Sequence, residues 1–211
     1  MPSEDRGNAG RELTTLHDNI DACRTCSSFV SPLDKPVGLV RGGVASIVVV
    51  GQSPGRRELA LRRAFAGMSG RRLDQWLVSC GAPAEDPRLP FYFTSVIKCL
   101  CPRPGDLPQM ARNCAPFLHR QLAIIQPSLV ITLGAVSFGQ LDFTRVPFAE
   151  ALCRTFATAD FELFPPYSTH FTMLVWPHPS GLNRWLNHPA HAAAHTASFD
   201  VVRQFLTPSA P

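Results

Sequence analysis

Short apolar runs rich in β-branched and aromatic residues alternate along this chain with stretches of helical periodicity. The runs cover residues 44–50 (VASIVVV), 91–96 (FYFTSV), 129–133 (LVITL) and 171–176 (FTMLVW). The helical stretches cover residues 11–26, 70–80, 109–125, a short segment ending at 141, and 191–205. Strands that are buried on both faces and joined by helices have this pattern. The sequence therefore predicts an α/β fold, a three-layer α/β/α sandwich around a central, mostly parallel four-stranded sheet.

Length and composition set the expected class of the molecule. With 211 residues the chain is long enough for one domain with a sizeable core, which we place at residues 11–207. Residues 1–10 are polar and charged, and we expect them to be disordered. No apolar run reaches the roughly 18 residues that a membrane span needs, so we expect no membrane association. Seven cysteines without a signal peptide favour a reducing, cytoplasmic location.

Four cysteines in two widely separated pairs form the most distinctive chemical pattern. Cys23 and Cys26 make a C-x-x-C near the N-terminus, and Cys99 and Cys114 follow after a gap of 72 residues. Close spacing followed by a long gap is typical of a metal or iron–sulfur centre that pins the N-terminal segment onto a distant part of the fold. Four thiolates suit tetrahedral zinc as well as a cluster, so the spacing leaves both open. Cys101, two residues from Cys99, is a competing ligand.

Polar residues at the ends of three predicted strands indicate where a ligand binds. Gln52 follows the first strand in a G-Q-S-P-G turn, Ser95 ends the second strand, and His178 follows the fourth. Ligands of parallel α/β folds bind outside the carboxyl ends of the strands. We therefore expect these three side chains to converge on a single cavity.

Arginines gather between residues 56 and 72, and such a local basic patch is more informative than the net charge of +4. They are Arg56, Arg57, Arg62, Arg63, Arg71 and Arg72. Arginines in nucleic-acid-binding proteins often contact phosphates, but a charge run is equally often a solvated face. Glu58 lies among them, and for this residue we favour a surface ion pair over the alternative of a carboxylate that faces the pocket.

The order of these segments resembles the uracil-DNA glycosylase superfamily, most closely its iron–sulfur-containing family 4 and 5 branch. G-Q-S-P-G at residues 51–55 matches the first glycosylase motif, G-x-x-P-G. The segment R-A-F-A-G-M-S-G around Phe65 is similar to the family's P-F-V-G segment. F-Y-F-T-S-V-I-K-C ending at Cys99, N-C-A-P-F-L around Cys114 and H-P-S at residues 178–180 resemble the motifs that follow. The matching segments extend from Cys23 to about Asn187.

The chain departs from this family pattern in the first motif and at the base-reading position. Gln52 stands where family 4 enzymes carry a glutamate, and Ser53 stands where family 1 enzymes carry an aspartate. Ser95 stands where the uracil-reading asparagine is expected. One hydroxyl cannot match an amide's paired donor and acceptor, so a serine discriminates less well between bases or leaves room for a larger one.

The resemblance implies a DNA-repair enzyme that swings a damaged nucleotide out of the helix into a pocket. His178 then faces the carbonyl oxygen of the leaving base, and Gln52 positions the attacking water. Residues expected to contact the base are Gly51, Ser53, Phe65, Ser95 and Ser180, with the Phe65 ring stacking on it. Leu182 is the expected wedge, and Asn183 and Arg184 hold the opposite strand or nearby phosphates.

Each of these roles has a plainer structural alternative. Phe65 and Leu182 also suit a hydrophobic core, Ser95 suits a strand serine bonded to backbone, and His178 suits a buried structural histidine.

We therefore expect a monofunctional DNA glycosylase, a hydrolase that removes a deaminated base in base excision repair, with uracil as the first guess and hypoxanthine as another substrate. The alternative is a catalytically weak or inactive DNA-lesion-binding protein on the same scaffold. The resemblance favours a structural [4Fe–4S] cluster over zinc, held by Cys23, Cys26, Cys99 and Cys114. It also implies damaged DNA as the partner and a monomeric state.

Overall fold

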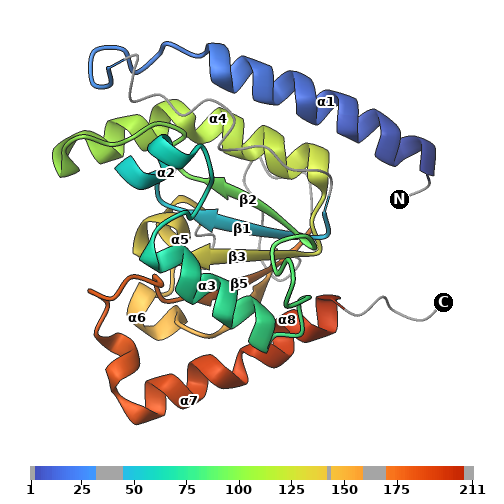
Figure 1. Cartoon of the computed structure of the whole chain (residues 1–211), viewed down its shortest axis with the longest axis vertical. Helices are drawn as coiled ribbons and strands as arrows, with labels where there is room; N and C mark the ends of the chain where they lie inside the picture. Colours follow the sequence, from blue (N-terminus) through green and yellow to red (C-terminus); the bar gives the residue numbers. More distant parts are fainter. Residues whose placement is uncertain (1–2, 32–44, 142–143, 159–169, 207–211) are drawn as a thin grey trace.

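The structure is a computed structural model that describes residues 3–31, 45–141, 144–158 and 170–206 (Figure 1). Within that part of the chain, one sheet contains five strands in the order β2-β1-β3-β5-β4. They are β1 (Ile47–Gly51), β2 (Phe91–Ser95), β3 (Leu129–Leu133), β4 (Thr155–Ala157) and β5 (Thr172–Trp176). Strands β1, β2, β3 and β5 are parallel to one another, whereas β4 pairs antiparallel with β5 at the edge of the sheet. The mostly parallel sheet is confirmed, with one strand more than the four expected.

The helices surround this sheet. They are α1 (Ser3–Ala22), α2 (Arg56–Leu61), α3 (Met68–Ser79), α4 (Leu107–Ile125), α5 (Ala135–Leu141), α6 (Phe148–Ala151), α7 (Pro189–Ala197) and α8 (Phe199–Leu206). Short 3₁₀ turns, η2 (Pro104–Asp106) and η4 (Trp185–Asn187), precede α4 and α7. No helix in the described ranges combines the length and the apolar character that crossing a membrane requires.

Both faces of the sheet are buried, which makes this a three-layer sandwich. Val48 and Val50 of β1 pack in one apolar cluster with residues of α1, α4 and α5. Ile47 and Val49 pack in a second cluster with residues of α3 and α8. All four valine and isoleucine side chains are fully buried. A strand buried on both faces needs apolar residues at every position, which explains the continuous run in the sequence.

Helix α1 begins earlier than the sequence suggested and lies along α4 (Figure 1). The expected disorder of residues 1–10 is therefore wrong for residues 3–10, while residues 1 and 2 lie outside the described ranges. A buried stripe at helical spacing explains the early start, and it consists of Ala9, Leu13, Leu16 and Ile20. The placing of residues 11–207 in one domain stays a prediction, and residue 207 is outside the described ranges.

The expected closing helix 191–205 is two helices, α7 and α8, that meet at Ser198. The Ser198 hydroxyl donates to the carbonyl of His195 (2.6 Å) and accepts from the indole N–H of Trp176 (2.8 Å). A serine that bonds to backbone competes with helical hydrogen bonding, so it ends α7 and anchors the junction on β5.

Candidate functional site

A cavity of about 220 Å³ opens where β1, β2 and β5 end. This volume is well above the roughly 10–15 Å³ that one water needs. Gly51, Gln52, Ser53, Phe65, Ser95 and His178 are among the residues that line it. The structure therefore brings together the three strand-end residues as expected. Ser180, Leu182, Asn183 and Arg184 are not among the described residues that line it.

The first motif is held against the end of β2 by backbone hydrogen bonds. The N–H of Val96 donates to the carbonyl of Gly51, and the N–H of Ile97 donates to the carbonyl of Gln52, both at 2.9 Å. Gly51 and Ser95 are partners in the parallel register of β1 and β2. These contacts fix the Gln52 and Ser95 side chains at neighbouring strand ends.

Phe65 lies over Gly51. A Cβ atom at position 51 would come within 2.8 Å of the Phe65 ring, so only glycine allows this approach. The ring also makes an edge contact with Phe93, with centroids 5.8 Å apart. Phe65 is half-buried, since one edge belongs to the second apolar cluster while the ring also lines the cavity. The core role and the ligand-facing role are thus compatible.

Ser95 presents hydrogen-bond acceptors to the cavity. Its hydroxyl donates to the carbonyl of Ile97 at 2.7 Å, which uses its only hydrogen. The oxygen keeps its lone pairs, so toward a ligand it acts as an acceptor. The expected backbone bond of this serine and its place in the cavity are therefore both present.

His178 follows β5 and sits above Gly134. A Cβ at Gly134, whose φ is +87°, would come within 3.2 Å of the His178 Cβ. The N–H of Ser180 donates to His178 Nδ1 at 3.1 Å, so Nδ1 is unprotonated and Nε2 carries the proton. Burial lowers the pKa of His178, which keeps the ring neutral near pH 7. The side chain is therefore a neutral N–H donor.

The loop after His178 is built by its own hydrogen bonds. The Asn183 amide donates to the carbonyl of His178 (3.1 Å), and its oxygen accepts from the N–H of Trp185 (3.0 Å). Leu182 is 92% exposed, so the alternative in which it belongs to the hydrophobic core is wrong. Arg184 is also exposed. Asn183 thus shapes the turn that presents Leu182, and a contact of Asn183 with DNA stays a prediction.

Glu58 is the residue that the sequence interpretation misplaced. Its carboxylate lines the cavity and accepts hydrogen bonds from the backbone N–H groups of Gly55 and Gly67, each at 3.1 Å. The expected surface ion pair is therefore wrong for this residue. A capping pattern was available, because Glu58 is the third residue of α2 after the N-cap Gly55.

The arginine patch lies on α2, on the turn before α3 and on α3 itself. Arg56, Arg57, Arg62, Arg63 and Arg71 are exposed. Arg72 is half-buried and donates to the carbonyl of Ser180 at 3.4 Å, which links α3 to the His178 loop. Whether the exposed arginines contact phosphates stays a prediction.

A second pocket is lined by Cys23, Cys26, Cys99 and Cys114. Burial raises the pKa of Cys114, which a hydrogen bond from the Lys98 backbone opposes. Cys101 is not among the described lining residues, and its thiol donates to the carbonyl of Arg103 at 3.2 Å. Across the described ranges, no three metal-binding side chains are close enough to hold one common ion.

Lys98 connects the two pockets. It is 3% exposed and lines the cysteine pocket, while its ammonium donates to the Thr94 hydroxyl (3.0 Å) and to the carbonyl of Ser95. Thr94 and Ser95 both line the larger cavity. The side chain of Lys98 thus links the cysteine pocket to Ser95 in the larger cavity.

The fold and the cavity define an α/β protein with a ligand site at the carboxyl ends of a parallel sheet. Residues 40–200, more than half of the chain, match the family model described as the uracil DNA glycosylase superfamily. The chain belongs to this superfamily.

Several curated relatives carry the name type-4 uracil-DNA glycosylase. The protein of Archaeoglobus fulgidus is 35% identical over 123 residues, which is 58% of this chain and 59% of the relative. The protein of Thermotoga maritima is 30% identical over 127 residues, 59% of this chain and 63% of the relative. The protein of Pyrobaculum aerophilum is 30% identical over 135 residues, which is 60% of this chain and 62% of the relative. The aligned part thus covers about three fifths of each relative.

Proposed function

We propose that this protein is a DNA glycosylase that hydrolyses the bond between deoxyribose and a flipped, deaminated base, with uracil as the first candidate. The observation that carries the proposal is the meeting of Gln52, Ser95 and His178 beside Phe65 in one cavity at the strand ends. Membership of the uracil DNA glycosylase superfamily and the named relatives support it.

In the proposed reaction, a water forms a bond to C1′ while the base leaves with the electrons of the glycosidic bond, and the proton that the water loses ends on the departed base anion. The neutral His178 donates its Nε2–H to the base oxygen on which negative charge develops. Removing one such donor typically costs about 3–4 kcal/mol of transition-state stabilisation. Gln52 orients the water through its side-chain carbonyl but cannot take its proton, so this site relies on positioning and electrostatics.

DNA is the proposed partner, and the exposed loop after His178 is the proposed wedge. Leu182 projects almost completely into solvent at 92% exposure, which suits a side chain that fills the gap left by a flipped nucleotide. Arg184 and the exposed arginines of α2 and α3 supply positive charge for the phosphates.

We propose that the cysteine pocket holds a [4Fe–4S] cluster, which the resemblance to the iron–sulfur-containing branch favours and the relatives named type-4 uracil-DNA glycosylase support. Four thiolates suit a tetrahedral zinc ion as well as such a cluster. We propose Cys23, Cys26, Cys99 and Cys114 as the ligands of the cluster. The cluster supplies a structural link between the N-terminal segment and the sheet, because base hydrolysis moves no electrons.

A substrate panel tests the proposed function. Purified protein is incubated with single- and double-stranded oligonucleotides that contain uracil, hypoxanthine, xanthine or an unmodified base, and strands are then cleaved with alkali at abasic sites. Cleavage at a modified base supports the glycosylase, and the base that is cleaved fastest identifies the substrate. Binding without cleavage contradicts it. Gln52→Ala retaining full excision while Glu58→Gln loses it would contradict the water-positioning role of Gln52.

The second candidate is a lesion-binding protein that does not cleave. It is favoured by one observation: Glu58 is the one carboxylate among the described lining residues, and its two oxygens already accept backbone N–H groups. Such a carboxylate is poorly placed to activate water. Retention of the modified oligonucleotide with no alkali-labile product is the result that would identify this function.

A further inference from the structure

The turn that carries Phe65 has an unfavourable backbone geometry. Phe65 has φ of +50°, in the left-handed region that residues other than glycine rarely adopt. Arg62, at the end of α2, also has a positive φ of +49°, so two of these four successive residues have left-handed backbone geometry. A conformation of this kind persists only where surrounding contacts enforce it. The question is which contacts hold the Phe65 turn.

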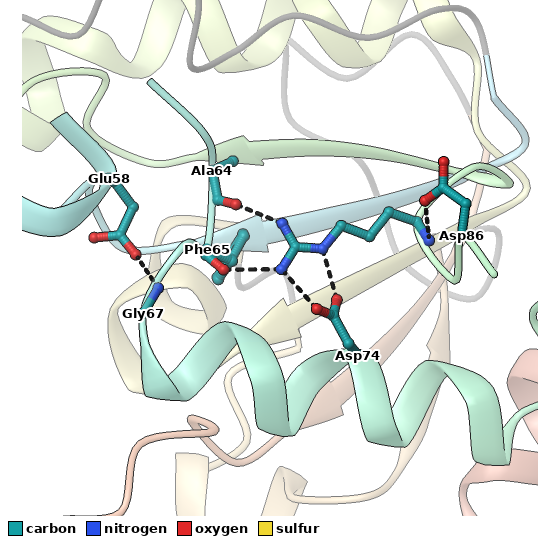
Figure 2. Close-up of polar contacts among 7 residues, drawn as sticks. Glu58, Ala64, Phe65, Gly67, Asp74 and Asp86 are labelled. Atoms are coloured by element: carbon teal, nitrogen blue, oxygen red, sulfur yellow. Dashed lines mark hydrogen bonds and ion pairs between the residues drawn. The ribbon is translucent and has the colours of Figure 1, made fainter. Parts of the chain in front are cut away.

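Arg88 supplies hydrogen bonds to two successive carbonyls of this turn. One terminal nitrogen of its guanidinium donates to the carbonyl of Ala64 at 2.6 Å, and the other donates to the carbonyl of Phe65 at 2.8 Å (Figure 2). Arg88 precedes β2, so these bonds join the turn to a segment more than 20 residues away in the sequence. Backbone carbonyls in regular structure bond to backbone N–H groups, and here an arginine takes their place.

Arg88 is itself oriented by Asp74 of α3. Its Nε donates to one carboxylate oxygen at 2.6 Å and a terminal nitrogen donates to the other at 3.0 Å, a two-pronged ion pair (Figure 2). The guanidinium also lies over the ring of Phe93, 5.6 Å from its centroid. The Arg88 side chain is only 13% exposed. A planar group held on one edge by a carboxylate and on one face by a ring has little freedom.

The other side of the turn is held independently. Glu58 accepts from the N–H of Gly67, which begins α3 just after the turn (Figure 2). The carbonyl of Phe65 lies so close to Gly70 that a Cβ there would be 1.6 Å from it. The Phe65 turn is thus enclosed by a carboxylate, a glycine and the Arg88 guanidinium.

We infer that Arg88, oriented by Asp74, is a positioning residue for base excision that holds the Phe65 turn so that its ring covers the base cavity. This inference rests on the proposed function, because it assigns Arg88 an effect on excision through the stacking role of Phe65. Arg88 is not among the described residues that line the cavity, and it acts through the two carbonyls. An ion pair that only stabilised the fold would affect excision independently of Phe65.

A double-mutant cycle separates the two possibilities. Single-turnover excision rates are measured for the wild-type protein, Arg88→Gln, Phe65→Ala and the double variant on the best substrate of the panel. We expect Arg88→Gln to lower the rate about ten- to a hundredfold, because small misplacements of a substrate-positioning group have effects of this size. In the Phe65→Ala background the same substitution should change the rate by less than about twofold. Equal effects in both backgrounds would overturn the inference.

Two further variants keep the test decisive if Arg88→Gln folds poorly. Asp74→Asn keeps a similar shape but removes the charge that orients Arg88, and its effect should also vanish in the Phe65→Ala background. Arg120→Gln is the matched control, since it removes an exposed arginine ion pair with Glu12 on the opposite side of the sheet. It should leave the rate unchanged. A wild-type protein that excises nothing contradicts the proposed function, whereas an active wild type with additive effects contradicts only the role of Arg88.

Hydrogen exchange gives a readout that needs no substrate. In the free protein, Arg88→Gln and Asp74→Asn should speed exchange of the backbone amides in residues 64–70, while the amides of β1 and β3 keep their protection. Faster exchange spread over the whole sheet would mean that the ion pair stabilises the fold generally, and would overturn a specific role in the turn.

Discussion

Under the proposed function, single side chains decide which base the cavity accepts, and Ser95 is the most informative of them. Its hydroxyl hydrogen is bonded to the Ile97 carbonyl, so the residue offers a ligand only acceptors. An acceptor reads an N–H on the base edge but gives no donor for a neighbouring base oxygen. Such a pocket recognises one feature that uracil shares with hypoxanthine and other bases.

Ser95→Asn should therefore sharpen the choice of base. The amide adds a donor beside the acceptor, which matches the adjacent N–H and carbonyl of uracil. We expect the ratio of kcat/KM for uracil to that for cytosine, whose edge carries an unprotonated nitrogen beside an amino group, to rise about tenfold, the effect of roughly one added hydrogen bond. The measurement is excision of both substrates by the wild-type protein and the variant. Ser95→Ala serves as control, and an unchanged ratio in Ser95→Asn would show that this position does not read the base.

The contrast between His178 and Glu58 shows what sequence can predict at the residue scale. His178 follows an apolar run that ends in H-P-S, so both its position and its approach to the cavity were predictable. Glu58 lies among arginines in the sequence, which favoured an ion pair. Its actual partners are two backbone N–H groups of glycines. The capping position of Glu58 in α2 indicates the bond to Gly55, whereas nothing in the sequence indicates the bond to Gly67.

At the scale of an element, the start of α3 and the Phe65 turn form one unit. Gly70→Ala places a methyl group where the Phe65 carbonyl lies, since a Cβ at this position would be 1.6 Å from that oxygen. Because a main-chain atom cannot yield as a flexible side chain does, either α3 or the turn must move. We expect a loss of roughly 1–3 kcal/mol in the free energy of unfolding and at least a tenfold loss of excision. Urea unfolding and single-turnover assays measure the two effects.

Gly139→Ala is the matched control for that substitution. Gly139 lies within α5, and an added Cβ there would meet no atom within 4 Å. Alanine in a helix interior is favoured over glycine by about 0.5–1 kcal/mol, so this variant should be slightly more stable and equally active. Similar behaviour of the two variants would mean that the close contact at Gly70 is unimportant.

The parallel strands were predictable from sequence because burial on both faces demands continuous apolar residues, as in the β3 segment LVITL. Strand β4 was not predicted, because its three residues, TFA, are too few to show a period and its pairing depends on β5. The early start of α1 was missed because an alanine such as Ala9 is found in buried and exposed positions alike. Only the structure shows that Ala9 lies on the same buried stripe as Leu13 and Leu16.

On the scale of the whole molecule, acid should unfold this protein through its buried histidines. His195 is 3% exposed, and its Nε2 has no hydrogen-bond partner among the described residues. Burial lowers its pKa from 6.5 to about 4, so the folded state binds fewer protons than the unfolded state between these values. The stability from neutral His195 is complete above pH 6.5 and is lost as the pH falls toward 4. The loss is about 2 kcal/mol at pH 5.

Urea unfolding at pH 7.5 and pH 5 measures this loss. His195→Leu removes the titrating group and should reduce the difference in the free energy of unfolding between the two pH values by about 2 kcal/mol. Because burial also lowers the pKa of His178, a smaller dependence of the same sign should remain in the His195 variant. An equally steep dependence in His195→Leu would assign the acid sensitivity to other groups.

The cysteine pocket joins the N-terminal segment to β2 and α4, so occupancy by the proposed cluster should affect the whole molecule. Cys23 and Cys26 follow α1, Cys99 follows β2, and Cys114 lies in α4. The substitution Cys99→Ser removes one proposed cluster ligand. Because Lys98 bonds to the Ser95 carbonyl, movement of this segment also reaches the base cavity. We expect Cys99→Ser to lose iron and the broad visible absorption, to unfold at a lower temperature and to excise more slowly.

Cys101→Ser separates a specific ligand from a general effect of losing a thiol. Cys101 is two residues from Cys99 but bonds to the Arg103 carbonyl and is not among the described residues that line the pocket. The iron content, visible absorption and Tm of the Cys101→Ser variant should therefore equal those of the wild-type protein when both are purified identically and measured anaerobically. Since four thiolates also suit zinc, metal analysis of the wild type is decisive. A colourless protein with one zinc per chain, or iron retained in Cys99→Ser, would refute the proposed cluster.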